Sequence, residues 1–414
     1  MKKTSKEERS WIMYDWANSA YSISVTTALL PTLYNTMTKS AGISENLSLA
    51  YLGYANFIAS FMVALMAPIL GTIADYKDKK KKFFMFFFLL GVGFTGLLAI
   101  VPMGQWKLLL GFYVFTAIGF SGANIFYDSF LVDVTTKKKM DSVSSKGFAY
   151  GYIGSTIPFV ISIAIIATHG KIGISEPTAY QIGFIITALW WGMFTMPMIK
   201  NVKQQYYIEP EGQLIKMSFK RLYKTLREIK EHKNIFLFLM AYFFYIDGVG
   251  TIIKMSVSYG AAVGIDKMQM ILVLLVGQLV AFPCALIYGK LASKYSAKRM
   301  IEIAILVYVF ICFYAYQLNS VTEYWILAAL VFSSQGGIQA LSRSYFGKLI
   351  PKEKSNEFFG FYNIFGKFAA IFGPLLLGLV AVVTGKAQFG VFSIVIFFIV
   401  GGFLLRRLPN IEIE

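Results

Sequence analysis

The sequence is poor in cysteine, histidine and charge. Its 414 residues include two cysteines and two histidines, and charged residues make up 15% of the chain. Cys284 and Cys312 lie inside apolar runs, while His169 and His232 stand in polar connections without partner ligands. This usage argues against a disulfide framework and a metal site, so we expect no cofactor. Soluble domains carry about 25% charged residues, so the low charge also argues against a soluble protein.

Apolar residues dominate the chain: hydrophobic residues make up 57% and aromatic residues 17%. An apolar run of about 20 residues predicts a membrane-spanning helix. The sequence contains twelve such runs, at 11–37, 48–74, 83–103, 107–134, 145–168, 178–199, 234–262, 266–292, 298–317, 322–350, 355–384 and 386–408. We therefore expect an all-α, multi-pass integral membrane protein, located in the plasma membrane if the chain is bacterial.

The net charge of +17 is distributed unevenly between the connections. Basic residues gather in clusters such as KDKKKK (77–82) and TKKK (136–139), whereas the opposite connections hold only Lys39, Lys107, Lys171, Lys267 and Lys386. Cytoplasmic connections of membrane proteins are enriched in Lys and Arg, so this bias places both termini in the cytoplasm. It also explains the net charge without a nucleic-acid partner.

The longest connection divides the chain into two halves of six predicted spans. We expect an N-terminal half at 1–199, a cytoplasmic linker at 200–233 and a C-terminal half at 234–414. Within the linker, apolar residues recur at helical spacing among basic residues: Ile215, Phe219, Leu222, Leu226 and Ile229. This pattern predicts an amphipathic helix that lies on the inner membrane surface, with docking of a partner protein as the alternative.

The two halves resemble each other in sequence. The matching segments are GTIADYKDKKK (71–81) with GKLASKYSAKR (289–299), SGANIFYDSF (121–130) with GGIQALSRSY (336–345), and FAYGYIG (148–154) with GFYNIFG (360–366). The alignment pairs Asn124 with Gln339 and Asp128 with Arg343. It also places Ser293 where the first half has Asp75.

Two parallel six-helix halves joined by a central linker resemble the major facilitator superfamily of secondary transporters. Gly71, Ala74 and Asp75 match the G-x-x-A-D loop of that superfamily. The resemblance implies that Gly71 and Asp75 serve conformational change. It also implies that spans one, four, seven and ten line a central cavity.

Polar residues follow the expected stripes on those four helices. The candidate residues for substrate binding or gating are Asp15, Asn18, Ser19, Tyr21, Asn124, Asp128, Asp247, Lys254, Gln339, Arg343 and Lys367. Polar residues can also join neighbouring helices. Three roles for the charges stay open: a gate between the halves, contact with a zwitterionic solute through a bidentate arginine or a lysine, and proton coupling by an aspartate.

Three segments resemble one facilitator family, the autophagy-related vacuolar amino-acid effluxers of fungi and their bacterial relatives. They are YDWANSAY (14–21), YIDGVGTIIK (245–254) and QALSRSYFGKLIP (339–351) with EFFGFYNIFGK (357–367). The resemblance implies transport of amino acids by alternating access. The alternatives are export or flipping of lipids or drug-like amphiphiles, and a membrane sensor or scaffold that transports nothing.

We expect a secondary transporter and not an enzyme, because neither a constellation of catalytic residues nor an ATP-binding domain stands out. The expected partners are a small-molecule substrate and membrane lipids, with protons as the candidate coupling ion. We expect the protein to be a monomer.

Overall fold

The structure is a computed structural model that describes residues 4–209, 214–227, 232–262, 266–318 and 320–411. The described chain is helical, with one isolated β-bridge between Tyr76 and Ile208. The elements are α1 (Lys6–Ala20), η1 (Tyr21–Leu29), α2 (Leu30–Ser40), α3 (Glu45–Ala74), α4 (Lys79–Leu97), η2 (Leu98–Ile100), α5 (Trp106–Ser129), α6 (Leu131–Val134), α7 (Met140–Thr168), α8 (Glu176–Asn201), α9 (Leu214–Arg227), α10 (Lys233–Ala262), α11 (Lys267–Tyr295), α12 (Ala297–Tyr316), α13 (Val321–Leu349), η4 (Lys352–Lys354), α14 (Ser355–Thr384), α15 (Ala387–Ser393) and α16 (Val395–Arg406).

Within the described residues, eleven helical segments are long and apolar enough to cross a membrane. The first predicted span is the exception, because it consists of α1, the π-helix η1 and α2 in direct succession. Together these three pieces cover the predicted span at 11–37 without an interruption. The fold class is therefore all-α, and a twelfth crossing by this composite segment stays a prediction.

Large apolar side chains remain exposed along these helices. Leu49 is 69% exposed, Leu189 67% and Val382 83%. Soluble monomers seldom expose apolar surface on this scale, whereas a membrane protein places it against lipid. The protein is a multi-pass membrane protein.

Side-chain caps fix where several helices begin. At α1, the Ser5 hydroxyl accepts a hydrogen bond from the Glu8 amide at 3.1 Å, and the Glu8 carboxylate accepts one from the Ser5 amide at 2.8 Å. This reciprocal capping box satisfies two amides that lack partners within the helix. Ser320 similarly accepts from the Glu323 amide at the start of α13.

The chain forms two compact units, and neither is a simple half of the sequence. Unit 1 comprises residues 1–134, 150–219 and 353–360, and unit 2 comprises 135–149, 220–352 and 361–414. Helices α7 and α14 therefore each belong to both units. The first ten residues of α7 (140–149) pack within unit 2, and the first six of α14 (355–360) pack within unit 1.

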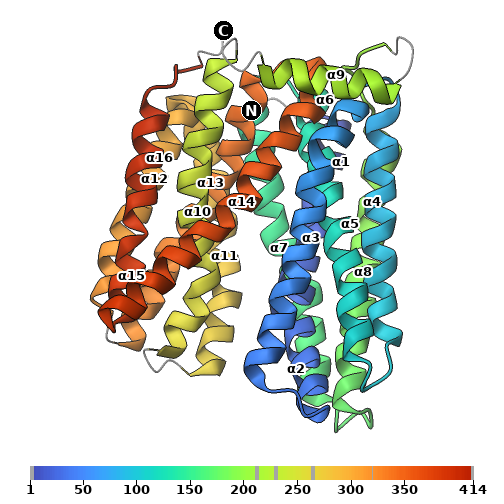
Figure 1. Cartoon of the computed structure of the whole chain (residues 1–414), viewed down its shortest axis with the longest axis vertical. Helices are drawn as coiled ribbons and strands as arrows, with labels where there is room; N and C mark the ends of the chain where they lie inside the picture. The colour runs from blue at the N-terminus through green and yellow to red at the C-terminus, as the bar shows by residue number, and fades with distance from the viewer. Residues whose placement is uncertain (1–3, 210–213, 228–231, 263–265, 319, 412–414) are drawn as a thin grey trace. The chain divides into compact units, whose positions relative to one another are not determined.

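Helix packing repeats from one unit to the other. In unit 1, α5 packs against α3 and α4, and α1 packs against α8 (Figure 1). In unit 2, α13 packs against α11 and α12, and α10 packs against α16. The helices that correspond in the sequence repeat therefore make the same pairs.

Candidate functional site

In unit 1, predicted site residues join α1 and η1 to α5. Asn18 donates from Nδ2 to Oδ1 of Asn124 at 2.6 Å, and the hydroxyls of Tyr21 and Thr116 share a hydrogen bond of 2.6 Å. Tyr21 also lies against Phe120, with ring centroids 4.7 Å apart, and is 2% exposed. Its ring is thus committed to packing between these helices.

The other polar residues predicted for this site are Asp15 and Ser19 of α1 and Asp128 of α5. Asp15 is 8% exposed, and Asp128 is half-buried near the end of α5. Gly151 of α7 packs on Ser19, because a Cβ at Gly151 would lie 2.6 Å from the Ser19 Oγ. A pair between Asp128 and Arg343 would join different units and stays a prediction.

The π-helix η1 continues the stripe beyond Tyr21. Its Thr27 hydroxyl donates to the carbonyl of Ser22, five residues earlier, at 2.9 Å. Ser22, Thr26 and Thr27 are exposed although they lie in an apolar segment. Segments of π-helix are often found at functional sites, and this one presents hydroxyls on a predicted cavity helix.

In unit 2, Asp247 of α10 is fully buried against α14. Its Oδ1 accepts hydrogen bonds from the Gly373 amide at 2.9 Å and the Thr251 hydroxyl at 3.4 Å. Only glycine fits at 373, because a Cβ there would lie 1.9 Å from the Thr251 Oγ1. The other carboxylate oxygen, Oδ2, is buried without a hydrogen-bond partner in the described part of the chain.

Lys254 of α10 and Lys367 of α14 are the two lysines of the site in this unit. Lys254 is exposed and Lys367 is half-buried. Among the residues that the structure describes, neither ammonium has a hydrogen bond or an ion pair. Gln339 of α13 is half-buried. Unit 2 thus offers two ammonium groups and one carboxylate oxygen that make no hydrogen bond to protein groups in the described part of the chain.

The start of α14 is held within unit 1 by a set of contacts that we call the α14 anchor. The Asp75 carboxylate accepts from the Asn356 amide at 2.8 Å, from the Asn356 side chain at 3.0 Å and from the Glu357 amide at 3.4 Å. Amides at a helix start lack partners within the helix and favour an anion. Gly71 allows this approach, since a Cβ there would lie 2.5 Å from the Asn356 carbonyl oxygen.

A buried ion pair completes the α14 anchor. The Lys80 ammonium lies 2.6 Å from Asp133 Oδ2, and both side chains are 0% exposed. Lys80 also donates to the Ser355 hydroxyl at 2.9 Å and to the Ser129 carbonyl at 3.3 Å. It therefore ties the ends of α5 and α6 to the first residue of α14.

The start of α7 is held within unit 2 by different chemistry, which we call the α7 anchor. The Asp141 carboxylate receives the Lys348 ammonium at 2.5 Å and the Ser344 hydroxyl at 2.7 Å. Arg343 donates to the Ser144 hydroxyl at 3.0 Å and lies 4.5 Å from the Phe148 ring centroid. Lys348 and Asp141 are both almost completely buried.

The sequence singles out Asp75, Gly71 and Arg343 but not several other residues of the two anchors. Asn356 and Ser355 stand at the predicted start of a span, where polar residues are common. The signal for Lys348 was present in the repeat, because the alignment of 121–130 with 336–345, continued three residues further, pairs it with Asp133.

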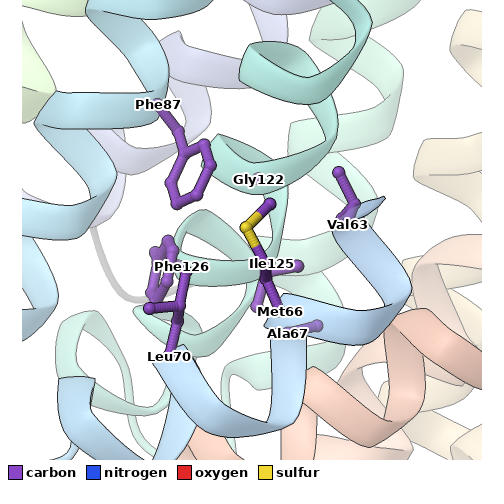
Figure 2. A pocket seen from close by; sticks show the side chains of 8 residues that line it. All are labelled: Val63, Met66, Ala67, Leu70, Phe87, Gly122, Ile125 and Phe126. Carbon is purple, nitrogen blue, oxygen red and sulfur yellow. The ribbon is translucent and has the colours of Figure 1, made fainter. Parts of the chain in front are cut away.

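A small pocket in unit 1 lies between α3, α4 and α5 (Figure 2). It is lined by Val63, Met66, Ala67, Leu70, Phe87, Gly122, Ile125 and Phe126. Figure 2 shows only carbon and sulfur in the lining side chains. The pocket therefore offers nothing to a charged solute and does not belong to the polar stripes.

Solved structures of major facilitator transporters share this architecture. The human organic anion transporter MFSD10 has a TM-score of 0.71 at 11% identity, covering 96% of this chain and 99% of the other. The proton:xylose symporter XylE also has a TM-score of 0.71 at 11% identity, covering 98% and 95%. With the two repeated helix sets, this shows that the chain has the fold of the major facilitator transporters.

The chain belongs to the family described as vacuole effluxer Atg22 like, whose model matches residues 3–410. It is 55% identical to an uncharacterized MFS-type transporter, YxiO, of Bacillus subtilis, over 99% of this chain and 96% of the relative. It is 21% identical to autophagy-related protein 22 of Kluyveromyces lactis, over 84% and 77%. The bacterial relative indicates the plasma membrane as the location.

Proposed function

We propose that the protein moves a small polar organic solute, amino acids in the first place, across the plasma membrane by alternating access. The observation that carries this proposal is the set of unused charges in unit 2: the Lys254 and Lys367 ammonium groups and the Asp247 Oδ2. The fungal members of the family are vacuolar effluxers by description, which supports efflux of a related solute.

A charge inside a membrane helix costs about 2.5–3.5 kcal/mol or more, so charged groups there are kept for pairing or function. A zwitterion supplies the missing partners for both signs. Its carboxylate accepts hydrogen bonds from Lys254 or Lys367, and its ammonium donates to Asp247. An uncharged solute would leave the two ammonium groups and Asp247 Oδ2 without a hydrogen-bond partner, which disfavours neutral lipids and amphiphiles.

The orientation follows from charge. We propose twelve crossings, with α1, η1 and α2 together forming the first, and both termini in the cytoplasm. The clusters at 77–82 and 136–139 then lie on the cytoplasmic side, as the positive-inside rule requires. The functional division stays at 1–199, 200–233 and 234–414, although two helix starts pack within the unit of the other half.

The two anchors then lie at the cytoplasmic ends of their helices. Both join residues of opposite sequence halves: Asp75 with Asn356, and Asp141 with Lys348. Opening a path to the cytoplasm requires these contacts to break. Gly71, Asp75 and Arg343 thus belong to conformational control, whereas Asp15, Asn18, Ser19, Tyr21, Asn124, Asp128, Gln339 and the charges of unit 2 belong to the solute path.

Asp247 is the candidate for coupling to protons. An ionised carboxylate with a buried, unpaired oxygen is expensive in a low-dielectric interior. The carboxyl group therefore holds a proton or meets the ammonium of the solute at some stage of the cycle. The solute gradient, the proton gradient, or both supply the energy.

The test is uptake of a mixed, labelled amino-acid pool into liposomes that contain the purified protein, with and without an imposed proton gradient. Lys254→Gln and Lys367→Gln should each raise the KM about 10–100-fold, the expected loss of one charge-assisted hydrogen bond. Lys386→Gln is the matched control and should leave uptake unchanged, because Lys386 is exposed and lies between the last two membrane-crossing segments of the structure, Lys352–Thr384 and Gln388–Arg406.

Asp247→Asn should retain uptake down a solute gradient and lose its dependence on the proton gradient. If folded wild-type protein takes up no amino acid under either condition, the amino-acid assignment is wrong. Uptake of a fluorescent lipid or a drug-like cation by the same liposomes would then favour the amphiphile exporter.

A further inference from the structure

The segment that follows α8 contacts the α14 anchor directly, and we call residues 204–209 the linker strap. The amide of Ile208 donates to the Asp75 carbonyl at 2.9 Å, and the amide of Lys77 donates back to the Ile208 carbonyl at 3.2 Å. Together these two bonds form the isolated bridge between Tyr76 and Ile208. The strap is thereby fixed beside the turn that joins α3 to α4.

The strap also completes the end of α3. Gln204 donates from Nε2 to the Ala74 carbonyl at 3.1 Å. Carbonyls in the last turn of a helix lack partners within it, and a side-chain amide supplies one here. Asp75 directly follows Ala74, so the strap holds the backbone from which the Asp75 carboxylate reaches α14.

The second connection passes through Asp133. Its Oδ1 accepts hydrogen bonds from two successive strap amides, Gln205 at 2.8 Å and Tyr206 at 3.0 Å. Its Oδ2 receives the Lys80 ammonium. The strap therefore fixes the orientation in which Asp133 meets Lys80, and Lys80 in turn donates to Ser355 at the start of α14.

We propose that the linker strap is a positioning element of the α14 anchor, so that the central linker sets how readily the start of α14 is released during transport. Its two routes are the backbone at Asp75 and the carboxylate of Asp133. The regulatory part of this inference rests on the proposed alternating-access function. The contacts themselves lie within unit 1 and do not depend on the solute.

A merely structural strap would anchor the linker and leave α14 unaffected. The exposed pair between Lys77 and Glu209, at 3.4 Å, is of that kind, since both side chains are largely in solvent. The amides of Gln205 and Tyr206 differ from this exposed pair, because they donate to the carboxylate of Asp133, whose side chain is fully buried.

The decisive measurement is hydrogen exchange of the full-length protein, followed at residues 355–360. Gln205→Pro removes one amide that donates to Asp133. Gln204→Ala removes only side-chain bonds, which end at the carbonyls of Ala74, Asp75 and Tyr206. Gln205→Pro should raise exchange at the start of α14 about tenfold, the effect of losing one hydrogen bond to a charged group. Gln204→Ala should raise it by a smaller factor.

Lys203→Pro is the matched control. Val202 already has the extended backbone that a following proline requires, and no bond from the Lys203 amide is part of the strap. This variant should leave exchange at 355–360 unchanged.

The same variants should change the turnover of transport with little change in KM, because the solute site is elsewhere. Unchanged exchange at 355–360 in both strap variants, with faster exchange in the strap itself, would overturn the proposal. So would an equal rise in the control. If wild-type liposomes transport nothing, the proposed function fails, and the exchange result still decides whether the strap positions the anchor.

Discussion

The two anchors hold corresponding helix starts with different chemistry. In the α14 anchor, a carboxylate from the α3–α4 turn meets the backbone amides of the incoming helix. In the α7 anchor, the incoming helix brings its own carboxylate, Asp141, to a lysine and a serine of α13. A helix start can thus be held by its backbone or by its side chains.

Corresponding residues of the sequence repeat show where the two anchors differ. Ser293 stands where the first half has Asp75, and its hydroxyl donates to the Gly289 carbonyl of its own helix. Lys298 corresponds to Lys80, but it donates to the carbonyls of Arg406 and Leu408 at the end of α16. The second half has no carboxylate at the position of Asp75, and its lysine bonds elsewhere. The buried ion pair of the α7 anchor is instead formed by Asp141 of α7 and Lys348 of α13.

The largest expected effect is at the ion pair of the α7 anchor. Asp141→Ala leaves the Lys348 ammonium buried without its carboxylate, which should cost about 3–5 kcal/mol of stability. Thermal unfolding of the purified protein measures this loss.

The double variant Asp141→Leu with Lys348→Met is the control for that prediction. Replacing both members of a buried pair by apolar residues is often neutral or stabilising, so the double variant should unfold near the wild-type temperature. A double variant less stable than Asp141→Ala would contradict the account.

The next largest effect is expected at the glycine of each anchor, Gly71 or Gly289. The two glycines differ in whether they contact main chain or side chain. Gly71→Ala meets the backbone of Asn356, which cannot move without shifting α14, whereas Gly289→Ala meets the Cβ and Oγ of Ser145 at 2.5 and 2.7 Å. Each should cost about 1–3 kcal/mol through overpacking. Adding Ser145→Gly should restore most of the stability to Gly289→Ala, as measured by thermal unfolding.

No single side-chain truncation at position 356 should rescue Gly71→Ala, because the clash is with the main chain. Asn356→Ala combined with Gly71→Ala tests this. Recovery in that double variant would show that side chains also govern the α14 contact.

A smaller effect is expected at the helix cap. Asp75→Asn keeps an acceptor for the Asn356 amide but loses the negative charge at the helix start, which should cost up to about 2 kcal/mol because Asp75 is buried. Hydrogen exchange at residues 355–360 should become faster by the corresponding factor. Ser293→Ala, the equivalent change in the second half, should leave the start of α7 unaffected, because within the described residues Ser293 bonds only to the Gly289 carbonyl of its own helix. Equal effects of the two variants would remove the distinction between the anchors.

The sequence predicted the helices well because the length of an apolar run is set by membrane thickness and needs no tertiary information. Every predicted span overlaps a described helical segment, and α9 covers Leu214–Arg227 of the predicted amphipathic helix. The π-helix η1 was not predicted, since its geometry depends on packing such as the bond between Tyr21 and Thr116. Composition alone indicated only an ordinary span there.

Prediction of the site was less complete for a related reason. Asp75 stood out because a motif marks it, and Asp247 and Lys254 because they interrupt an apolar helix. The partners of Asp75 are largely backbone amides, which every residue carries. Asp141 and Lys348 lie at span ends, where charge is common, and only the fold shows that both are buried together.

The smallest effect is expected for a substitution that gives the α7 anchor the carboxylate of the α14 anchor. Ser293→Asp restores the acid that the first half has, near a helix start whose Ser145 hydroxyl is buried without a hydrogen-bond partner in the described part of the chain. Gly289, one turn earlier on α11, already packs on Ser145. The new carboxylate should therefore meet the hydroxyl and the amides at the start of α7 and stabilise it by about 0.3–1 kcal/mol.

Slower hydrogen exchange at residues 140–149 and slower uptake would be the signature, because a more firmly held α7 opens less often. Asp141 lies nearby, but Lys348 already neutralises its charge. Ser293→Asn offers the same hydrogen bond without the charge and should give a weaker effect. Faster exchange in Ser293→Asp would mean that repulsion from Asp141 outweighs the cap, and that the two anchors cannot be interconverted by their acid alone.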